Sequence, residues 1–454
     1  MSDLRSVTDA HFGEAVDFLG TLVHLPTIAR DPNSPIEDCV QLLHNEFIHL
    51  GARVEVLRLP GARPLLFVEI AGRSSRSLMF YQHYDVQPAG PLERWDSNPF
   101  EMTERDGVLY GRGIADNKGN LAARIAALRV LRDVHGELPL TVRFLIEGEE
   151  EIGSPYLPKY LQAYDALFRA DACIWEGGYR DADERFVVTL GSKGMCRVIL
   201  RAHGPVRDLH GKFAPLTFNP AVRLAAAINC LVEADGRVRV LDFYDAVVAP
   251  DERELAWITA AAPDLEHLRQ ETGLGEKIPA HTGQEALERL VFLSTGNVEG
   301  FVAGAVGEEA RSIVPAEAVA NLCFRLVPNQ QPEAIYQQVR AYLDAQGFAD
   351  IEAEFSEGVL PARTRSDDPI VQATLSAVAA ASGETPLVWP MSPGTGPMAT
   401  VCHSRGIPAL ALGVGNAGSS THAPNENIRL NDYRLGIEVI ARLIETFAEA
   451  DDAG

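Results

Sequence analysis

Between residues 141 and 154 the chain reads Thr141-Val142-Arg143-Phe144-Leu145-Ile146-Glu147-Gly148-Glu149-Glu150-Glu151-Ile152-Gly153-Ser154. The apolar run over 141–146 is typical of a buried strand, and the acids follow it at its carboxyl end, where open α/β sheets place their sites. A run of charges is usually a solvated face. Four carboxylates this close repel one another unless some are protonated or cations neutralise them, so the segment indicates a candidate metal site.

The segments around this run alternate between strand and helix periodicity, which favours an α/β layer fold. Leu121, Ile125, Leu128 and Leu131 share one face of a helix that begins after residue 119. Helices are also expected over 12–23 and 37–50, and strands over 53–59, 65–70, 78–81 and 173–175.

The middle of the chain has a different pattern. A strand over 194–202 and a helix over 219–232 precede an irregular stretch over 235–288, and then a strand, a helix and a strand are expected over 318–325, 332–345 and 351–355. The α/β pattern returns with helices over 370–381 and 431–449 and a strand over 409–412. We therefore predict an α/β catalytic domain over 1–192 and 366–454, with a mixed central sheet flanked by helices, and an inserted smaller α+β domain over 193–365.

The composition limits the classes of function. With 46% hydrophobic and 23% charged residues the 454-residue chain has an ordinary globular balance. Its 40 basic against 63 acidic residues, a net charge of -23, make nucleic acid an unfavourable partner. The 6 cysteines include no C-x-x-C pair, which argues against a disulfide scaffold or a zinc finger. Neither a signal peptide nor an apolar run of membrane-spanning length is evident, so we expect a cytoplasmic protein that does not bind a membrane.

Two further segments carry metal-ligating residue types near strand or helix ends. His83 and Asp85 are two residues apart at the end of an apolar strand, where a carboxylate can hold the second ring nitrogen of a ligating histidine. Such a pair is also a common structural hydrogen bond. Asp116 lies among glycines in Gly111-Arg112-Gly113-Ile114-Ala115-Asp116-Asn117-Lys118-Gly119, although an aspartate there is more often a helix N-cap.

Two single residues complete the candidate set. Glu176 follows the apolar run 173–175, and His422 lies in a polar loop after the strand expected over 409–412. Together with the earlier candidates they provide oxygen and nitrogen ligands without a thiolate, which suits two divalent ions of the zinc type. Mn²⁺ and Co²⁺ suit the same ligands.

The order of these motifs resembles the M20 metallopeptidase family. His-x-Asp at 83–85 is followed by Gly-Arg-Gly-x-x-Asp-Asn-Lys-Gly, Glu-Gly-x-Glu-Glu-x-Gly-Ser, an acid and a late histidine, most like the dipeptidase and carnosinase branch. The resemblance implies roles for the matching residues: His83 and Glu176 would bind one zinc ion, Glu151 and His422 the other, Asp116 would bridge both, Asp85 would orient His83, and Glu150 would be the general base.

The resemblance also implies a substrate-binding and dimerising role for the inserted domain, which would act as a lid. His210 would reach into the site of a partner subunit, although Gly211 stands where the family usually has serine. Arg325 would bind the carboxylate of the substrate. The glycine-rich loop with Gly394, Thr395 and Gly396 would lie near the C-terminal side of the substrate.

The expected function is dizinc-dependent hydrolysis of an amide bond in dipeptides or short peptides with a free C-terminal carboxylate, by a metal-bridging water with Glu150 as base. The alternatives are an N-acyl amino acid deacylase with the same site and a non-catalytic binding protein on the same fold. The pattern G-x-G-x-x-G at 413–418 suggests a dinucleotide site. We favour a tight loop that places His422, because residues 419–427 are polar and contain a proline where that motif needs a helix.

Overall fold

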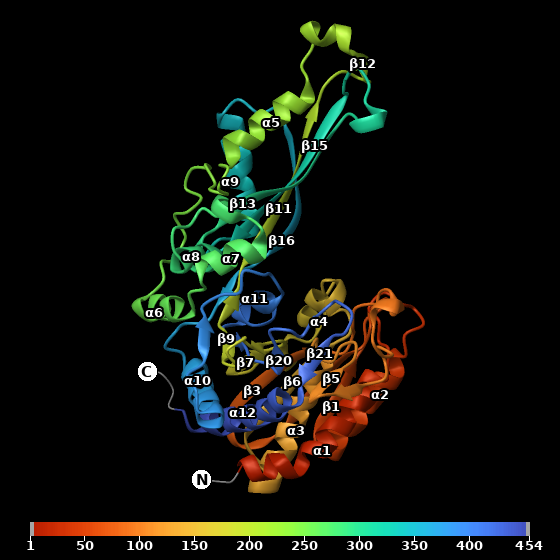
Figure 1. Ribbon diagram of the computed structural model, residues 1–454, viewed down its shortest axis with the longest axis vertical. Coiled ribbons are helices and arrows are strands. Elements are labelled where there is room, and N and C mark those ends of the chain that lie inside the picture. The colour runs from red at the N-terminus through yellow and green to blue at the C-terminus, as the bar shows by residue number, and fades with distance from the viewer. Residues whose placement is uncertain (1–3, 451–454) are drawn as a thin grey trace. The chain divides into compact units, whose positions relative to one another are not determined.

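The computed structural model describes residues 4–450, apart from the side chain of Glu271, and divides into two compact units. The first unit comprises residues 4–191, 363–390 and 400–450, and the second comprises residues 192–362 and 391–399 (Figure 1). The chain passes from the first unit to the second at β10 (Gly191–Ser192) and returns at β17 (Ala362–Arg363). The glycine-rich segment 391–399 thus groups with the second unit, whereas the sequence assigned it to the catalytic domain.

A mixed ten-stranded sheet forms the centre of the first unit. Its two longest strands, β3 and β6, are parallel neighbours, whereas β1 and β2 add antiparallel to one side. This agrees with the predicted mixed α/β class. The order is β1 (Arg53–Leu57), β2 (Leu65–Ile70), β6 (Leu138–Glu147), β3 (Gly72–His83), β7 (Ala172–Trp175), β19 (Ala409–Ala411), β9 (Phe186–Thr189), β8 (Tyr179–Arg180) and β20 (Gly415–Asn416), with β18 (Leu387–Trp389) paired to β9.

Four adjacent strands of this sheet, β6, β3, β7 and β19, run parallel to one another. Parallel neighbours end at the same edge of a sheet, so the residues that follow these strands are brought together whatever their separation in the chain. This edge holds the metal-ligand candidates.

Helices cover both faces of the sheet (Figure 1). On one face Phe47 of α2 (Ile36–His49) packs on Phe144, with ring centroids 4.9 Å apart, and Phe144 packs on Phe80 at 5.1 Å. Phe67 on the opposite face packs edge-on against Phe168, which follows α4 (Leu157–Ala163). Four longer helices pack against one another: α1 (Leu4–Val23), α3 (Lys118–His135), α10 (Pro369–Ser382) and α12 (Leu430–Glu449). A small sheet of β4 (Thr103–Arg105), β5 (Val108–Tyr110) and β21 (Asn427–Arg429) completes the unit.

The second unit is built on an antiparallel sheet of four strands in the order β13 (Thr295–Ala303), β15 (Glu317–Leu326), β11 (Gly194–His203) and β16 (Glu352–Val359). Apolar residues of α5 (Pro220–Leu231) and α9 (Pro332–Ala345) pack against this sheet and form the core of the unit, with Leu224, Val339 and Phe324 fully buried. A short ribbon pairs β12 (Leu209–His210) with β14 (Ile313–Val314).

The prediction of an irregular stretch over 235–288 is wrong. The structure contains α6 (Glu252–Ala261), α7 (Leu265–Thr272) and α8 (Gly283–Phe292), and the edge strand β13 also escaped prediction. Each helix is too short to show a clear apolar periodicity. The residues that cap these helices are of the types that favour an N-cap, which the sequence does display. Asp251, Asp264 and Thr282 each accept a hydrogen bond from the backbone N–H of the third residue of their helix.

No helix within residues 4–450 is long and apolar enough to cross a membrane. The cysteines carry free thiols, and all are buried except the half-buried Cys230. They act as small apolar side chains, as expected.

Candidate metal centre

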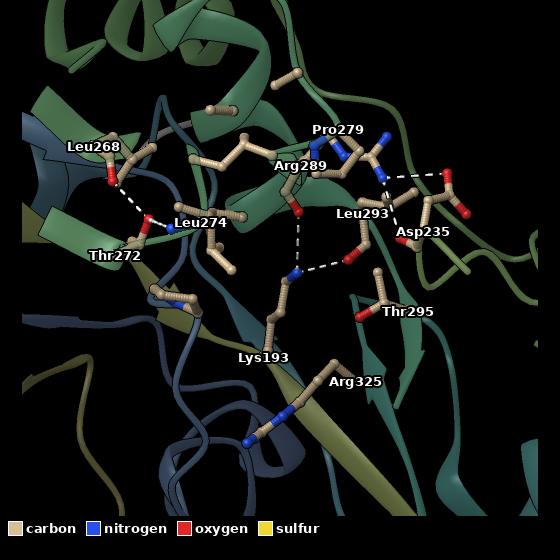
Figure 2. A pocket seen from close by; sticks show the side chains of 15 residues that line it. Lys193, Asp235, Leu268, Thr272, Leu274, Pro279, Arg289, Leu293, Thr295 and Arg325 are labelled. Atoms are coloured by element: carbon tan, nitrogen blue, oxygen red, sulfur yellow. Dashed lines mark hydrogen bonds and ion pairs between the residues drawn. The ribbon is translucent and has the colours of Figure 1, made fainter. Parts of the chain in front are cut away.

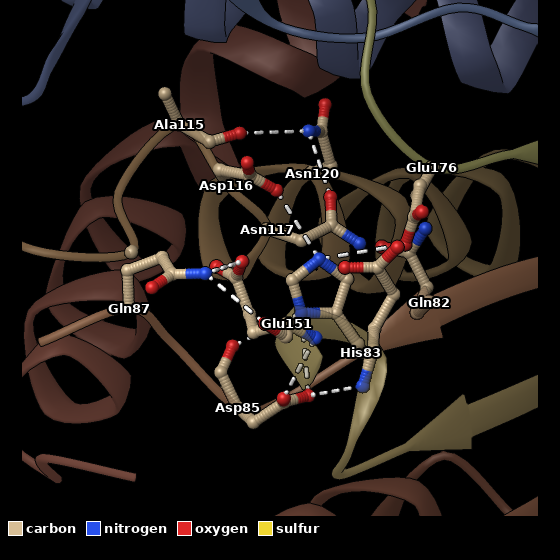
Figure 3. A network of polar contacts seen from close by, with 12 residues as sticks. Gln82, His83, Asp85, Gln87, Ala115, Asp116, Asn117, Asn120, Glu151 and Glu176 are labelled. Atoms are coloured by element: carbon tan, nitrogen blue, oxygen red, sulfur yellow. Dashed lines mark hydrogen bonds and ion pairs between the residues drawn. The ribbon is translucent and has the colours of Figure 1, made fainter. Parts of the chain in front are cut away.

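The predicted metal ligands of the first unit lie together at the carboxyl ends of its parallel strands. Figure 3 shows four of them, His83, Asp116, Glu151 and Glu176. His83 is the last residue of β3, and Glu176 follows β7 directly. Glu150 and Glu151 form a 3₁₀ turn just beyond β6. Asp116 precedes α3, and His422 lies in the loop after β20 with a left-handed φ of 63°.

The ligand atoms form two groups, each with its members within 4.8 Å of one another. His83, Glu150 and Glu176 make one group, and Asp116, Glu151 and His422 make the other. Asp116 connects them, because its Oδ1 lies 3.2 Å from Nε2 of His83 and its Oδ2 lies 3.1 Å from Nε2 of His422. One carboxylate therefore faces both groups, as a bridging ligand must.

Asp85 organises two neighbouring parts of the site. The Nδ1–H of His83 donates to the main-chain oxygen of Asp85 at 3.0 Å, which leaves Nε2 of His83 free for a metal. The carboxylate of Asp85 accepts hydrogen bonds from the backbone N–H groups of Glu150 at 3.2 Å and Glu151 at 3.1 Å. Nδ1 of His83 is thus closer to the main-chain oxygen of Asp85 than to its carboxylate, 3.5 Å away, which was the expected partner; the carboxylate instead holds the turn that presents the two glutamates.

The acids of the 147–151 run point in different directions. Glu147 is buried, accepts hydrogen bonds from Tyr81 and from Oγ of Ser154, and has its pKa raised by burial to about 8. Glu149 accepts the backbone N–H of Arg63 at 3.2 Å. Only Glu150 and Glu151 belong to the ligand groups. The raised pKa of Glu147 favours its neutral form, and the side chains diverge; both reduce the repulsion that the sequence implied.

The buried carboxylates of the cluster favour the binding of cations. Burial, and then the neighbouring Glu150 carboxylate, raise the pKa of Glu176 well above its usual range. Hydrogen bonds to Asp116 and Glu151 raise the pKa of His422 to about 10. Oε2 of Glu176 is buried, lies 3.4 Å from Nε2 of His83 and has no hydrogen-bond partner within residues 4–450. A buried oxygen of this kind is costly unless something binds it, and two divalent ions fit the oxygen and nitrogen ligands present.

Glu426 is a site residue that the sequence did not reveal. Its buried carboxylate accepts hydrogen bonds from Arg112 at 2.6 Å and from the backbone N–H groups of Gly113, Ala115 and Asp116 at 2.9, 2.9 and 3.0 Å. It therefore shapes the loop that presents Asp116. Nothing in the polar loop 420–426 distinguishes an acid that turns inward from one that faces solvent.

The remaining charges of the 111–119 motif are also structural. The buried Lys118 donates to the carbonyl oxygens of Leu22 at 2.9 Å and Leu25 at 2.6 Å, at the end of α1. Asn117 precedes α3 as its N-cap residue, so Asp116 is left free for the metal site rather than acting as the cap.

Arg124 and Gln87 are two further residues that sequence reasoning missed. Arg124 on α3 donates to the carbonyl oxygens of Tyr81, Trp175 and Leu412, which lie at or just beyond the ends of β3, β7 and β19. It thereby ties together the strand ends that carry His83 and Glu176. Gln87 donates to Oε2 of Glu151 at 2.9 Å. It stands two residues after Asp85 in the sequence, as Asp85 stands two residues after His83.

The other predicted residues belong to the second unit. The exposed His210 accepts the backbone N–H of Lys212 at its Nδ1, 3.2 Å away. A Cβ on Gly211 would lie 2.6 Å from Oγ of Ser312, so a side chain at this position would require the hydroxyl of Ser312 to move. Arg325 donates to Oγ1 of Thr395 at 3.1 Å, so it lies beside the Gly394–Gly396 loop.

The glycines at 413–418 serve close packing. A Cβ on Gly413 would lie 2.4 Å from the carbonyl oxygen of Gly177, and turns rather than a helix follow over 417–426. This arrangement agrees with a tight loop ahead of His422.

Comparisons with known proteins point to one family. Residues 79–446 match the sequence profile of peptidase family M20/M25/M40. A structure described as an M20 family metallo-carboxypeptidase, Sso-CP2 from Sulfolobus solfataricus, matches with a TM-score of 0.84 at 34% identity over 96% of this chain and 99% of that chain. The Beta-Ala-His dipeptidase of Homo sapiens is 29% identical over 72% of this chain and 69% of its own. The Cys-Gly metallodipeptidase dug1 of Schizosaccharomyces pombe is 26% identical over 76% and 75%. The suspected resemblance to the dipeptidase and carnosinase branch is thereby confirmed.

The position of Asp116 between the two groups yields a test by metal analysis. Asp116→Ala should lose both ions, because neither group keeps its shared carboxylate, and should have no turnover. Metal content by plasma mass spectrometry measures this directly, with Asp38→Ala on the exposed face of α2 as the matched control. A fully loaded and active Asp116→Ala protein would exclude a shared dimetal site.

Proposed function

The chain belongs to peptidase family M20/M25/M40 and is a metallopeptidase, and from this premise we propose that it hydrolyses dipeptides or short peptides that end in a free carboxylate. The observation that carries the proposal is the pair of ligand groups joined by Asp116. The relatives support the substrate class, since two are named for the dipeptides they cleave and a third is named a carboxypeptidase.

Two divalent ions are the proposed cofactor, most simply Zn²⁺, with Mn²⁺ or Co²⁺ as alternatives. His83 and Glu176 would hold one ion, Glu151 and His422 the other, and Asp116 would contact both. When bound, such ions lower the pKa of an attacking water toward ~7 and polarise the scissile carbonyl.

Glu150 is the proposed general base. Its backbone is held by Asp85, and its carboxylate lies within 4.8 Å of the ligand atoms of His83 and Glu176. Burial raises the pKa of Glu150 above that of a free glutamate, which improves its ability to accept a proton. Glu150 would take the proton of the attacking water and pass it to the nitrogen of the leaving amine, after which the C–N bond breaks.

Arg325 is the proposed ligand of the substrate carboxylate. It contacts a neutral hydroxyl, that of Thr395, and no acidic partner within residues 4–450. A guanidinium keeps its charge and can bind both oxygens of a carboxylate. Gly394 is exposed and Gly396 is half-buried on either side of Thr395. The backbone of this loop would border the carboxylate end of the substrate.

We also propose a homodimer that forms through the second unit. The edge strand β13 exposes Val298, Phe301 and Val302, and α5 with the segment before it exposes Phe218 and Val222. Apolar side chains on an open sheet edge usually mark an interface. The exposed His210 of one subunit would then complete the site of its partner.

Substitution of the adjacent glutamates tests the base. Glu150→Gln should retain metal but lose at least ~10²-fold in kcat, because the amide cannot accept a proton. Glu149→Gln is the matched control and should stay far more active, since Glu149 contacts the backbone of Arg63 instead. Assays should use Ala-Ala and N-acetylalanine, so that release of acetate alone would identify a deacylase.

Removal of the Arg325 side chain tests carboxylate recognition. Arg325→Ala should lower kcat/KM on free dipeptides by about 10- to 150-fold, the kinetic equivalent of losing a charged hydrogen bond worth about 1.5–3 kcal/mol. Amidated dipeptides should start poor and lose little more. Arg201→Ala, on the same sheet and paired with Glu354, is the control. An equal loss on both substrates would assign Arg325 to folding.

Mixing of two inactive variants tests the action of His210 on a partner. His210→Ala and Glu150→Gln subunits, combined in one dimer, should regain one intact site and therefore part of the activity. Light scattering must first establish the dimer, and differential tags isolate the mixed species. Inactive mixed dimers would show that His210 does not act across subunits.

A further inference from the structure

A cavity of about 360 Å³ lies wholly within the second unit (Figure 2). Helices α7 and α8, with the segment between them, form most of its wall, and Arg325, Lys193 and Pro393 line its remaining side. Its volume lies within the range of small-ligand sites. Two of the three helices that the sequence did not predict, α7 and α8, thus create a pocket next to the proposed carboxylate ligand.

Most of the wall is apolar, and part of it is left uncovered by the fold. Leu274 is 50% exposed and Leu290 is 42% exposed, although Leu287 on the same helix as Leu290 is buried. Leu268, Ile278 and Leu293 continue the apolar lining. Large apolar side chains that face an open pocket gain free energy when an apolar group covers them.

The polar side of the cavity is cationic. Lys193 is 4% exposed and donates to the carbonyl oxygens of Leu293 at 2.6 Å and Arg289 at 3.5 Å, which are neutral acceptors. Asp235 also lines the cavity, but Arg289 binds it at 3.4 Å. Burial, and then the charge of Arg325, lower the pKa of Lys193 to about 8. Lys193 and Arg325 thus have no acidic partner among the described residues 4–450, and an anionic ligand would supply the missing counter-charge.

A ligand that matches this pocket carries a carboxylate next to an apolar group, as the last residue of a peptide does. We propose that the cavity is the specificity pocket for the C-terminal side chain of the substrate. It favours a large apolar residue such as leucine or phenylalanine, and Leu274 and Leu290 form the selective part of its wall. This inference rests on the proposed peptidase function and extends it to the choice of substrate.

The charge arrangement explains why the pocket selects a terminal residue and not any apolar group. Arg325 would bind the terminal carboxylate at the edge of the cavity, while the apolar side chain enters beside α8. The field of Lys193 adds to the preference for an anionic substrate end and opposes a lysine or arginine side chain in the pocket.

The test compares Ala-Phe and Ala-Leu with Ala-Gly on the metal-loaded, full-length protein. Wild type should favour the two apolar substrates in kcat/KM. Leu290→Ala should reduce the Ala-Phe to Ala-Gly ratio roughly tenfold, the scale at which an apolar pocket discriminates. Leu290→Trp, which fills the cavity, should also reduce this ratio. Leu255→Ala on α6 is the matched control, since Leu255 is 36% exposed and lies outside the cavity.

Binding to the Glu150→Gln protein supplies a readout without turnover. Calorimetry should show tighter binding of Ala-Phe than of Ala-Gly, and Leu290→Ala in that background should remove the difference. Circular dichroism verifies that each variant is folded.

The outcomes separate the two proposals. Hydrolysis of every dipeptide with equal efficiency, unaffected by either Leu290 substitution, overturns the pocket and leaves the peptidase function intact. A metal-loaded protein that cleaves no dipeptide overturns the function and the pocket with it. Hexanoate that stabilises the protein without competing with Ala-Phe would show a separate carboxylate site and also overturn the proposal.

Discussion

Electrostatic repulsion among the carboxylates at the edge of the parallel strands is the constraint on which the first unit depends. Asp116, Glu150, Glu151 and Glu176 lie within two adjoining groups, with only two histidines among them. Such a cluster is stable only if its backbone is held rigidly and cations balance its charge. Four parallel strand ends provide the rigid frame, and the ligand groups themselves define where two ions fit.

The buried charges outside the cluster keep that frame in place. Arg112 binds Glu426 at 2.6 Å with both side chains buried, and Arg124 binds carbonyl oxygens at three strand ends. Removing one partner of a buried pair costs on the order of 3–5 kcal/mol, because the other charge is left unpaired. Within the described part of the chain these two arginines bind Glu426 and main-chain oxygens and not the ligand groups, so they can fix the geometry without competing for the metal ligands.

The proposed function divides chemistry and recognition between the two units. The first unit holds the proposed metal ligands and the base, whereas the second holds Arg325, the Gly394–Gly396 loop and the apolar cavity. The wall of that cavity comes from α7 and α8, which lie outside the sheet and helices that form the core of the second unit. Under the proposed pocket, changes in these short helices would alter substrate preference while the metal centre stays unchanged.

The sequence by itself determined the α/β class, most long helices and strands, and the candidate ligands, because apolar periodicity and the order of the motifs are local properties. Only the tertiary structure showed that Glu147 and Glu149 bind partners outside the ligand groups, and that Glu426, Arg124 and Gln87 support the site. Their partners are distant in the chain, as Glu426 is from Gly113, and no local pattern encodes such a contact. The cavity likewise exists only after α7 and α8 pack beside Arg325, since short helices without clear periodicity acquire a buried face from their neighbours.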